Sequence, residues 1–210
     1  MFARKLILSC AMLAAAALPS FAQTESEEYV RQNANDVLAS LNAPDLTPDE
    51  RRAQFQAYMD EFTNLDAVAK FVIGKYSKRF TPEEMDLYLT SFRAYALAVY
   101  EYYFNEFRGR DVKVTGSTER TSRDAIVDTD IVRADGQELE VRWRVLNRGG
   151  KYQVVDVALE DGGNVIWLAI EQRAQFLSIL DKNAGSVDAL VTKIDSMTDE
   201  LVALRTTDAS

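Results

Sequence analysis

The amino-acid sequence predicts an α+β fold in which a curved antiparallel sheet of about four to five strands packs against several helices. Two observations support this prediction. Helix start and stop signals divide residues 24–108 and 167–204 into segments with helical spacing of apolar residues. Residues 111–160 between them alternate apolar and polar side chains and contain glycine turns, which is typical of an antiparallel meander. Helices on both sides of a meander favour one sheet with a face covered by helices.

The beginning of the chain has the features of a secretory signal peptide. Arg4 and Lys5 precede the apolar run LILSCAMLAAAALP, and small residues follow up to Ala22. The run is too short to predict a membrane span with confidence. We therefore expect a signal peptide over residues 1–22 and a single mature domain over residues 23–210. Cys10, which Ser9 precedes, leaves a lipoprotein anchor as an alternative.

The composition excludes several classes of site. The sequence contains no histidine, and its one cysteine lies in the expected signal peptide. Serine–histidine triads, thiolate nucleophiles and zinc sites built on histidine or cysteine are therefore excluded from the mature chain. The net charge of −9 argues against broad nucleic-acid binding, which requires cations along a whole face. We expect no metal and no cofactor.

Three helices are predicted in the first part of the chain. The first covers residues 24–43. The sequence TPDE at 47–50 combines a capping box with proline in the first turn, so a second helix should begin there and extend to about Phe62. Asn64 is placed to cap a short third helix that Gly74 ends.

A long fourth helix is predicted from the TPEE sequence at 81–84 to about residue 108. One face of this helix is rich in aromatic residues. Such a stripe is usually plain core, but the surplus of rings also fits a deep apolar pocket between the helix and the sheet. The residues that share the face are Met85, Tyr88, Phe92, Tyr95, Val99, Tyr103 and Phe107.

The segment LEVRWRV is the clearest strand, because its apolar and charged residues alternate without exception. Asp135-Gly136 before it and Gly149-Gly150 after it are hairpin signals. The chain then turns at 161–163 and returns to helical spacing in WLAIEQRAQFLSIL, and a last helix should follow Gly185. The expected strands are 111–119, 124–134, 138–147 and 151–160, and the expected last helix is 186–204.

Carboxylates offer the one route to an enzyme. Asp128 and Asp130 share a strand face, although a solvated sheet face explains them better. Asp156 lies within the apolar sequence QVVDVAL, where burial would raise its pKa, and a structural contact explains it equally well. Either Asp128 or Asp156 with Tyr95 or Tyr103 could form an isomerase-like or hydratase-like site. A third alternative is an adaptor with a solid core.

The stretch KFVIGKYSKRF at 70–80 concentrates cations beside apolar residues in an acidic chain. Lys70, Lys75, Lys78 and Arg79 could border a pocket and meet anionic head groups or an acidic partner. A solvated turn without a specific role is an equal alternative.

Two segments carry a resemblance to a known family: FVIGKYSKRFTPEEMDLYLTSFRAY at 71–95 and YQVVDVALEDGGNVIWLAIEQRAQF at 152–176. Their order and spacing resemble the MlaC family, the periplasmic phospholipid-binding components of the Mla lipid-transport system, which are also called toluene-tolerance auxiliary proteins. Ser77, Tyr152 and the turn at 161–164 depart from the family pattern. The matching positions are Gly74, Lys75, Pro82, Glu83, Phe92, Arg93, Val155, Asp156, Val157, Gly162, Arg173 and Phe176.

The resemblance implies a cystatin-like or nuclear-transport-factor-like fold that encloses lipid tails and leaves the head group outside. It implies a periplasmic phospholipid carrier without catalysis, which maintains outer-membrane lipid asymmetry. The implied partners are an inner-membrane ABC transporter complex and an outer-membrane lipoprotein complex. A hopanoid carrier of the same family is an alternative. We expect a monomer that binds no nucleic acid.

Pattern and resemblance together select the residues of the expected lipid site. The expected basic rim, for a head group or a partner, consists of Lys75, Lys78, Arg79 and Arg173. The expected lipid-binding residues are Val68, Phe71, Val72, Phe92, Tyr95, Val99, Tyr103, Val141, Trp143, Val155, Val157, Ile166 and Phe176.

Overall fold

The structure is a computed structural model. It describes residues 24–41, 43, 45–106, 111–132, 136, 138–161 and 163–208. The expected signal peptide and the expected end of the long helix near residue 108 lie outside the described residues.

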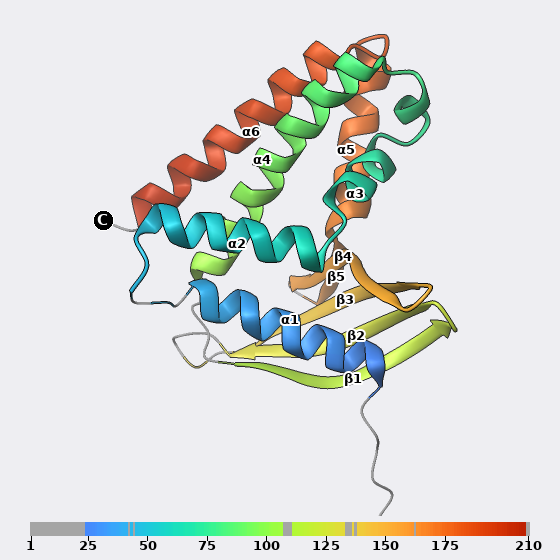
Figure 1. Ribbon diagram of the computed structural model, residues 1–210. Helices are drawn as coiled ribbons and strands as arrows, with labels where there is room; N and C mark the ends of the chain where they lie inside the picture. Colours follow the sequence, from blue (N-terminus) through green and yellow to red (C-terminus); the bar gives the residue numbers. More distant parts are fainter. Residues whose placement is uncertain are drawn as a thin grey trace, which may run out of the picture.

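The described part of the chain forms a helical layer above a sheet, with the first helix laid across the sheet (Figure 1). The α+β prediction is confirmed. The helices are α1 (Glu25–Leu41), α2 (Pro48–Phe62), α3 (Leu65–Ile73), the 3₁₀ helix η1 (Gly74–Lys78), α4 (Pro82–Glu106), α5 (Leu168–Lys182) and α6 (Val187–Asp208).

The sheet is an antiparallel meander in which each strand pairs with its neighbour in the chain. The sequence locates four of the expected four to five strands and predicts that the next helical segment begins at Trp167. Residues 164–167 form the fifth strand instead, because they pair with the end of the fourth strand. The strands are β1 (Val112–Thr121), β2 (Asp124–Val132), β3 (Glu138–Arg148), β4 (Lys151–Asp161) and β5 (Asn164–Trp167).

The helix starts follow from local capping, as the sequence predicts. Thr47 and Glu50 form the reciprocal capping box at the start of α2. The Asn64 side chain accepts a hydrogen bond from the Ala67 amide at the start of α3. Gly74 ends α3 with a φ of 51°, a conformation that favours glycine.

Two large hydrophobic clusters divide the interior of the described residues, and a smaller third one, Val37, Phe55 and Met59, joins α1 to α2. Helix α1 covers one face of the sheet, and its Val30 and Leu38 pack with Val127 and Val145. A second cluster joins α3, α4, α5 and α6, with Tyr88 and other residues fully buried in it. Helix α2 lies between these two groups (Figure 1). The junction between the clusters is where a cavity can form.

A β-bulge in β4 faces this junction. Arg144 pairs with Asp156 and Val145 pairs with Val154, so Val155 has no partner across the β3–β4 ladder. A bulge of this kind re-aims the side chains beside it. The result is that Asp156 reaches the start of α5, as described below.

Candidate functional site

The main cavity lies between α3, α4, the start of α5 and strand β4. It encloses about 580 Å³ of space between atoms, part of which is open to solvent. Its lining is Thr63, Leu65, Val68, Val72, Phe92, Tyr95, Ala96, Val99, Tyr100, Val154, Val155, Asp156, Val157, Leu168, Ala169 and Gln172.

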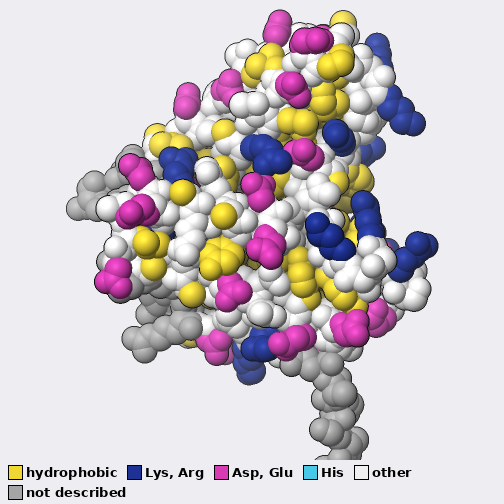
Figure 2. Space-filling model, in the orientation of Figure 1, with side chains coloured by type: hydrophobic (Ala, Val, Ile, Leu, Met, Phe, Trp, Pro, Cys, Tyr) yellow, Lys and Arg dark blue, Asp and Glu magenta, His cyan; other side chains and the backbone are white. Residues whose placement is uncertain are grey.

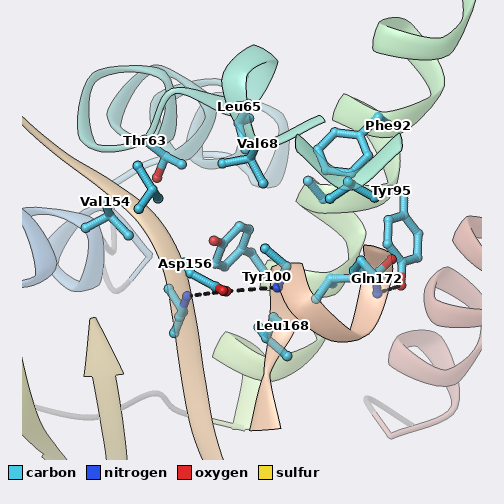
Figure 3. Close-up of a pocket in the computed structure, with 16 residues that line it drawn as sticks. Thr63, Leu65, Val68, Phe92, Tyr95, Tyr100, Val154, Asp156, Leu168 and Gln172 are labelled. Atoms are coloured by element: carbon cyan, nitrogen blue, oxygen red, sulfur yellow. Dashed lines mark hydrogen bonds between the residues drawn. The ribbon is translucent and has the colours of Figure 1, made fainter. Parts of the chain in front are cut away.

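The lining is largely aliphatic and aromatic, with a few polar groups at defined places. Leu65 and Val68 of α3 face Phe92 and Tyr95 of α4 across the upper part of the cavity (Figure 3). The Tyr100 ring stands in the middle, with its hydroxyl directed toward β4 (Figure 3). Such a lining suits a hydrocarbon ligand, because apolar walls bury apolar surface without leaving many polar groups unpaired.

The structure brings seven of the expected lipid-binding residues to this cavity. Helices α3 and α4 supply most of them, because their apolar faces turn toward β4 at the junction between the two clusters. The seven residues are Val68, Val72, Phe92, Tyr95, Val99, Val155 and Val157.

The other expected residues have different surroundings. Phe176 is fully buried among the helices, where its ring contacts Phe92 and Tyr95. Val141 and Trp143 belong to the cluster beneath α1. Phe71 and Ile166 are exposed, at 43% and 37%. The Tyr103 side chain lies outside the described residues.

Sequence reasoning missed several residues of the lining. Tyr100 belongs to the surplus of rings on α4 but not to the predicted face, and that surplus was the one available signal. Thr63 enters because the chain after α2 forms a parallel bridge with Val154 of β4. Gln172 enters from α5, and no local pattern distinguishes it from other polar helix positions.

Asp156 is a structural cap at the floor of the cavity. Its Oδ1 accepts hydrogen bonds from the Ala169 amide at 2.8 Å and from the Val157 amide at 2.9 Å (Figure 3). The first bond satisfies the start of α5, where the N-cap residue Trp167 offers no side-chain bond. Burial raises the pKa of Asp156, and the two amides and Arg144 oppose the rise.

Two buried polar atoms of the lining have no partner among the described residues. One is Thr63 Oγ and the other is Gln172 Oε1. The Gln172 Nε2 group donates to the Tyr95 hydroxyl at 2.6 Å, as its amide is oriented here. Buried polar atoms are nearly always paired, so these two atoms mark places where a ligand or water would complete the site.

The residues of the basic rim have separate surroundings. Lys75 forms an ion pair with Asp181 at 2.8 Å, and Tyr76 donates to the same carboxylate. These two hydrogen bonds lower the pKa of Asp181. Lys78 and Arg79 are exposed, and Arg79 lies over the Tyr76 ring. Figure 2 shows lysine and arginine side chains along the right-hand edge, on both sides of a hollow between the helices and the sheet.

Asp128 and Asp130 lie on the sheet face opposite α1 and away from the main cavity. Asp128 pairs with Arg142 at 3.4 Å, and Asp130 stands opposite Glu140. The described residues include no group of three or more acidic, cysteine or histidine side chains that could hold a metal ion. No helix in the described part of the chain is long and apolar enough to cross a membrane.

Comparisons with known proteins found one matching family model, one curated relative and a similar solved structure. The model of the MlaC protein family matches residues 31–196. The toluene tolerance protein ttg2D of Pseudomonas putida is 22% identical over 188 residues, which cover 86% of this chain and 84% of that protein. A phospholipid-binding protein from Ralstonia solanacearum, solved in complex with a phospholipid, superposes with a TM-score of 0.69 at 19% identity, covering 85% of this chain and 99% of the other.

Proposed function

The chain belongs to the MlaC protein family, and from this membership and the main cavity we propose that it is a periplasmic phospholipid carrier. In this proposal the mature domain, residues 23–210, binds acyl chains in the main cavity and keeps the head group outside. It moves lipid between an outer-membrane lipoprotein complex and an inner-membrane ABC transporter complex. Its role is to maintain the lipid asymmetry of the outer membrane.

The apolar cavity is the observation that carries the proposal. Each methylene group taken out of water contributes about 0.8 kcal/mol, so two ordinary acyl chains gain roughly 25 kcal/mol relative to water. The lipid leaves a membrane in which its tails are already shielded from water. The carrier therefore needs only to bury the tails about as favourably as the bilayer does. Transfer is then nearly balanced, and an energy-coupled partner can set its direction.

We propose that the basic rim, none of whose residues lines the main cavity, meets the head group or a partner. Lys78 and Arg79 are exposed, and no ion pair with a carboxylate is found for either among the described residues. They can therefore meet an anionic phosphate or an acidic partner surface. Lys75 already forms an ion pair with Asp181, and Arg173 already donates a hydrogen bond to the Phe71 carbonyl at the end of α3. These two residues therefore contribute less to binding an anionic group.

The enzyme alternative depends on Asp156, whose pKa is raised inside a pocket. Its Oδ1 holds the start of α5 and the Val157 amide, which accounts for the residue without catalysis. The phospholipid-bound structural relative also favours a carrier over an enzyme. A hopanoid would fit the same kind of apolar cavity, so the test must identify the lipid chemically.

The test is native mass spectrometry of the protein purified from a bacterial periplasm without detergent, followed by solvent extraction. We expect a stoichiometric adduct that extracts as phospholipid. Ala96→Phe should abolish the adduct, because Ala96 lines the cavity. Ala94→Phe is the matched control, since Ala94 is an exposed residue of the same helix. A bare mass that stays unchanged after incubation with vesicles would refute the carrier.

A further inference from the structure

We propose that Gln172 on α5 donates a hydrogen bond to an ester carbonyl of the bound lipid, at the point where an acyl chain joins the glycerol. The inference rests on the phospholipid-binding function proposed above and names a polar contact that would select ester-linked lipids. Gln172 is half-buried, and it is the only amide side chain among the described residues that line the main cavity.

The Gln172 amide has hydrogen-bonding capacity that the described residues do not use. A glutamine side chain offers two N–H donors and one carbonyl acceptor. One donor bonds to the Tyr95 hydroxyl at 2.6 Å (Figure 3), and no acceptor is found among the described residues for the other. The buried Oε1 has no donor among them either. If the oxygen and nitrogen of the amide exchange places, both N–H groups are left over, so a donor is available in either orientation.

Tyr95 holds this amide in place. The Tyr95 side chain is buried, with 6% of the residue exposed, and its ring packs against Phe176 of α5 with centroids 6.1 Å apart. Tyr95 also has a further contact, so its position does not depend on Gln172 alone. A donor that is already positioned binds a carbonyl with less loss of side-chain freedom than a mobile one. Gln172 is therefore a prepared donor at the wall of the cavity.

The surroundings of Gln172 on α5 match the order of groups in a phospholipid. Leu168 and Ala169, in the first turn of the helix, belong to the apolar lining. Arg173, the next residue after Gln172, lies outside the lining and covers the Phe71 ring. A phospholipid likewise has acyl chains, then ester carbonyls, then an anionic phosphate. An amide between an apolar wall and a cation can meet the ester while the chains contact the wall.

The ester carbonyl is the first polar group next to the acyl chains. It accepts hydrogen bonds and cannot donate them, so it needs a donor such as the remaining N–H of Gln172. Asp156 is occupied as the acceptor for two backbone amides. Thr63 also carries an unpaired buried hydroxyl, but it lies beside β4, across the cavity from Gln172 (Figure 3). Thr63 therefore provides a control within the same cavity.

The first test compares lipids that differ only in the ester carbonyls. Wild-type protein is equilibrated with mixed vesicles of diacyl and dialkyl phosphatidylglycerol in equal amounts and of equal chain length. The two adducts differ in mass and are counted by native mass spectrometry. We expect about fivefold more of the ester-linked adduct, the effect of one hydrogen bond. Equal adducts would overturn the inference and leave the carrier function standing. Absence of both adducts would refute the carrier function, and the inference would fall with it.

Three variants assign the preference to one side chain. Gln172→Leu keeps the wall apolar and should bind both lipids equally. Gln175→Leu lies on the same helix at an exposed position outside the lining, and Thr63→Val removes the other unpaired polar group with little change in shape. Both of these controls should keep the preference of the wild-type protein. A preference that survives in Gln172→Leu, or one that Thr63→Val abolishes, would overturn the inference.

The second test observes the carbonyl directly. Diacyl phosphatidylglycerol with isotope-labelled ester carbonyls is bound to the protein, and the infrared band of the label is recorded. A hydrogen bond lowers the C=O stretching frequency, so wild type should show a low-frequency component that Gln172→Leu lacks. A component of equal strength in both proteins would show that water makes the bond, and no such component in wild type would show that no bond forms. Either result would overturn the inference.

Discussion

The guanidinium group of Arg173 on α5 covers the ring of Phe71 on α3, 4.9 Å from its centroid, and donates a hydrogen bond to the carbonyl oxygen of the same residue. A cation at this position satisfies the C-terminal end of α3. The contact also joins two helices that line the main cavity. Arg173 therefore acts first as a clamp between α3 and α5.

This clamp makes Gly74 sensitive to substitution. A Cβ atom at Gly74 would lie 2.7 Å from Arg173 Nη2, and the φ of 51° is strained for any L side chain. We expect Gly74→Ala to lower the free energy of unfolding by about 1–3 kcal/mol. Chemical denaturation measures this change. Gly116→Ala is the control, because nothing lies within 4 Å of its added Cβ and its φ is not positive. Equal losses in the two variants would contradict the predicted strain at Gly74.

Removal of the cap at α5 should cost stability, whereas removal of its charge should not. Asp156→Ala leaves the Ala169 amide unpaired, and we expect a loss of about 1–2 kcal/mol. Asp156→Asn keeps an acceptor oxygen and removes the buried charge, so it should be at least as stable as wild type at pH 7. If Asn and Ala are equally destabilising, the charge itself is required and the cap assignment is wrong.

Comparison of Asp156→Asn with wild type also predicts in which direction stability changes with pH. The folded pKa of Asp156 is raised above its ordinary value of 3.8, so the folded state binds the proton more tightly than the unfolded state. The contribution of Asp156 to the free energy of unfolding therefore increases as the pH falls through the raised folded-state pKa. It stops increasing once the pH is below the unfolded-state pKa. The advantage of Asp156→Asn over wild type should be largest at pH 7 and shrink on acidification. Thermal melts of both proteins across this range measure it, and an advantage that grows on acidification would contradict the sign.

The basic rim should govern exchange with charged membranes. We expect Lys78→Glu combined with Arg79→Glu to slow lipid transfer to anionic vesicles at low salt, with little effect on neutral vesicles. The control combines Lys113→Glu with Lys193→Glu, which changes the net charge equally at exposed positions on β1 and α6. The measurement is transfer of a fluorescent lipid between vesicles at low and high salt, because screening should remove the difference. Equal rates in both double variants would refute the rim.

Like charges face one another on the outer side of the sheet. A side-chain hydrogen bond with Glu160 on β4 raises the pKa of Glu140 on β3, and the negative charges of Glu160 and Asp130 add to the rise. Opposite charges on neighbouring strands stabilise a sheet, so Glu160→Lys should raise the melting temperature at low salt. Glu138→Lys makes the same charge change where the cross-strand partner is Val132. An equal rise in both variants would show that net charge, and not the pairing, is responsible.

The sequence was sufficient to predict helix starts and most of the strands, because both depend on neighbours in the chain. Thr47 and Asn64 bond to amides three residues away, so their capping is visible in the sequence. The alternation in LEVRWRV likewise determines which side chains of β3 are buried. The position of β5 could not be predicted, because four residues are too few to show the alternation of apolar and polar side chains that marks a strand.

The site was predicted only in part, because apolar periodicity does not distinguish core from cavity wall. Val99 and Phe176 both lie on apolar helix faces, yet only Val99 lines the main cavity. That difference depends on how far apart the two layers pack, which is a non-local property. The bulge at Val155 likewise depends on the register between β3 and β4.

The order of the strands also affects how the chain folds. Because the sheet order follows the chain, each hairpin can close as soon as its second strand has left the ribosome or a translocation channel. Helix α1 is in the opposite position. Its Glu27 accepts a hydrogen bond from Ser117, and its Glu25 from Tyr152, so α1 waits for partners that lie 90 and 127 residues later in the chain. During that interval the side of α1 that packs on the sheet has no cover, and a chaperone that holds this helix would protect the chain from aggregation.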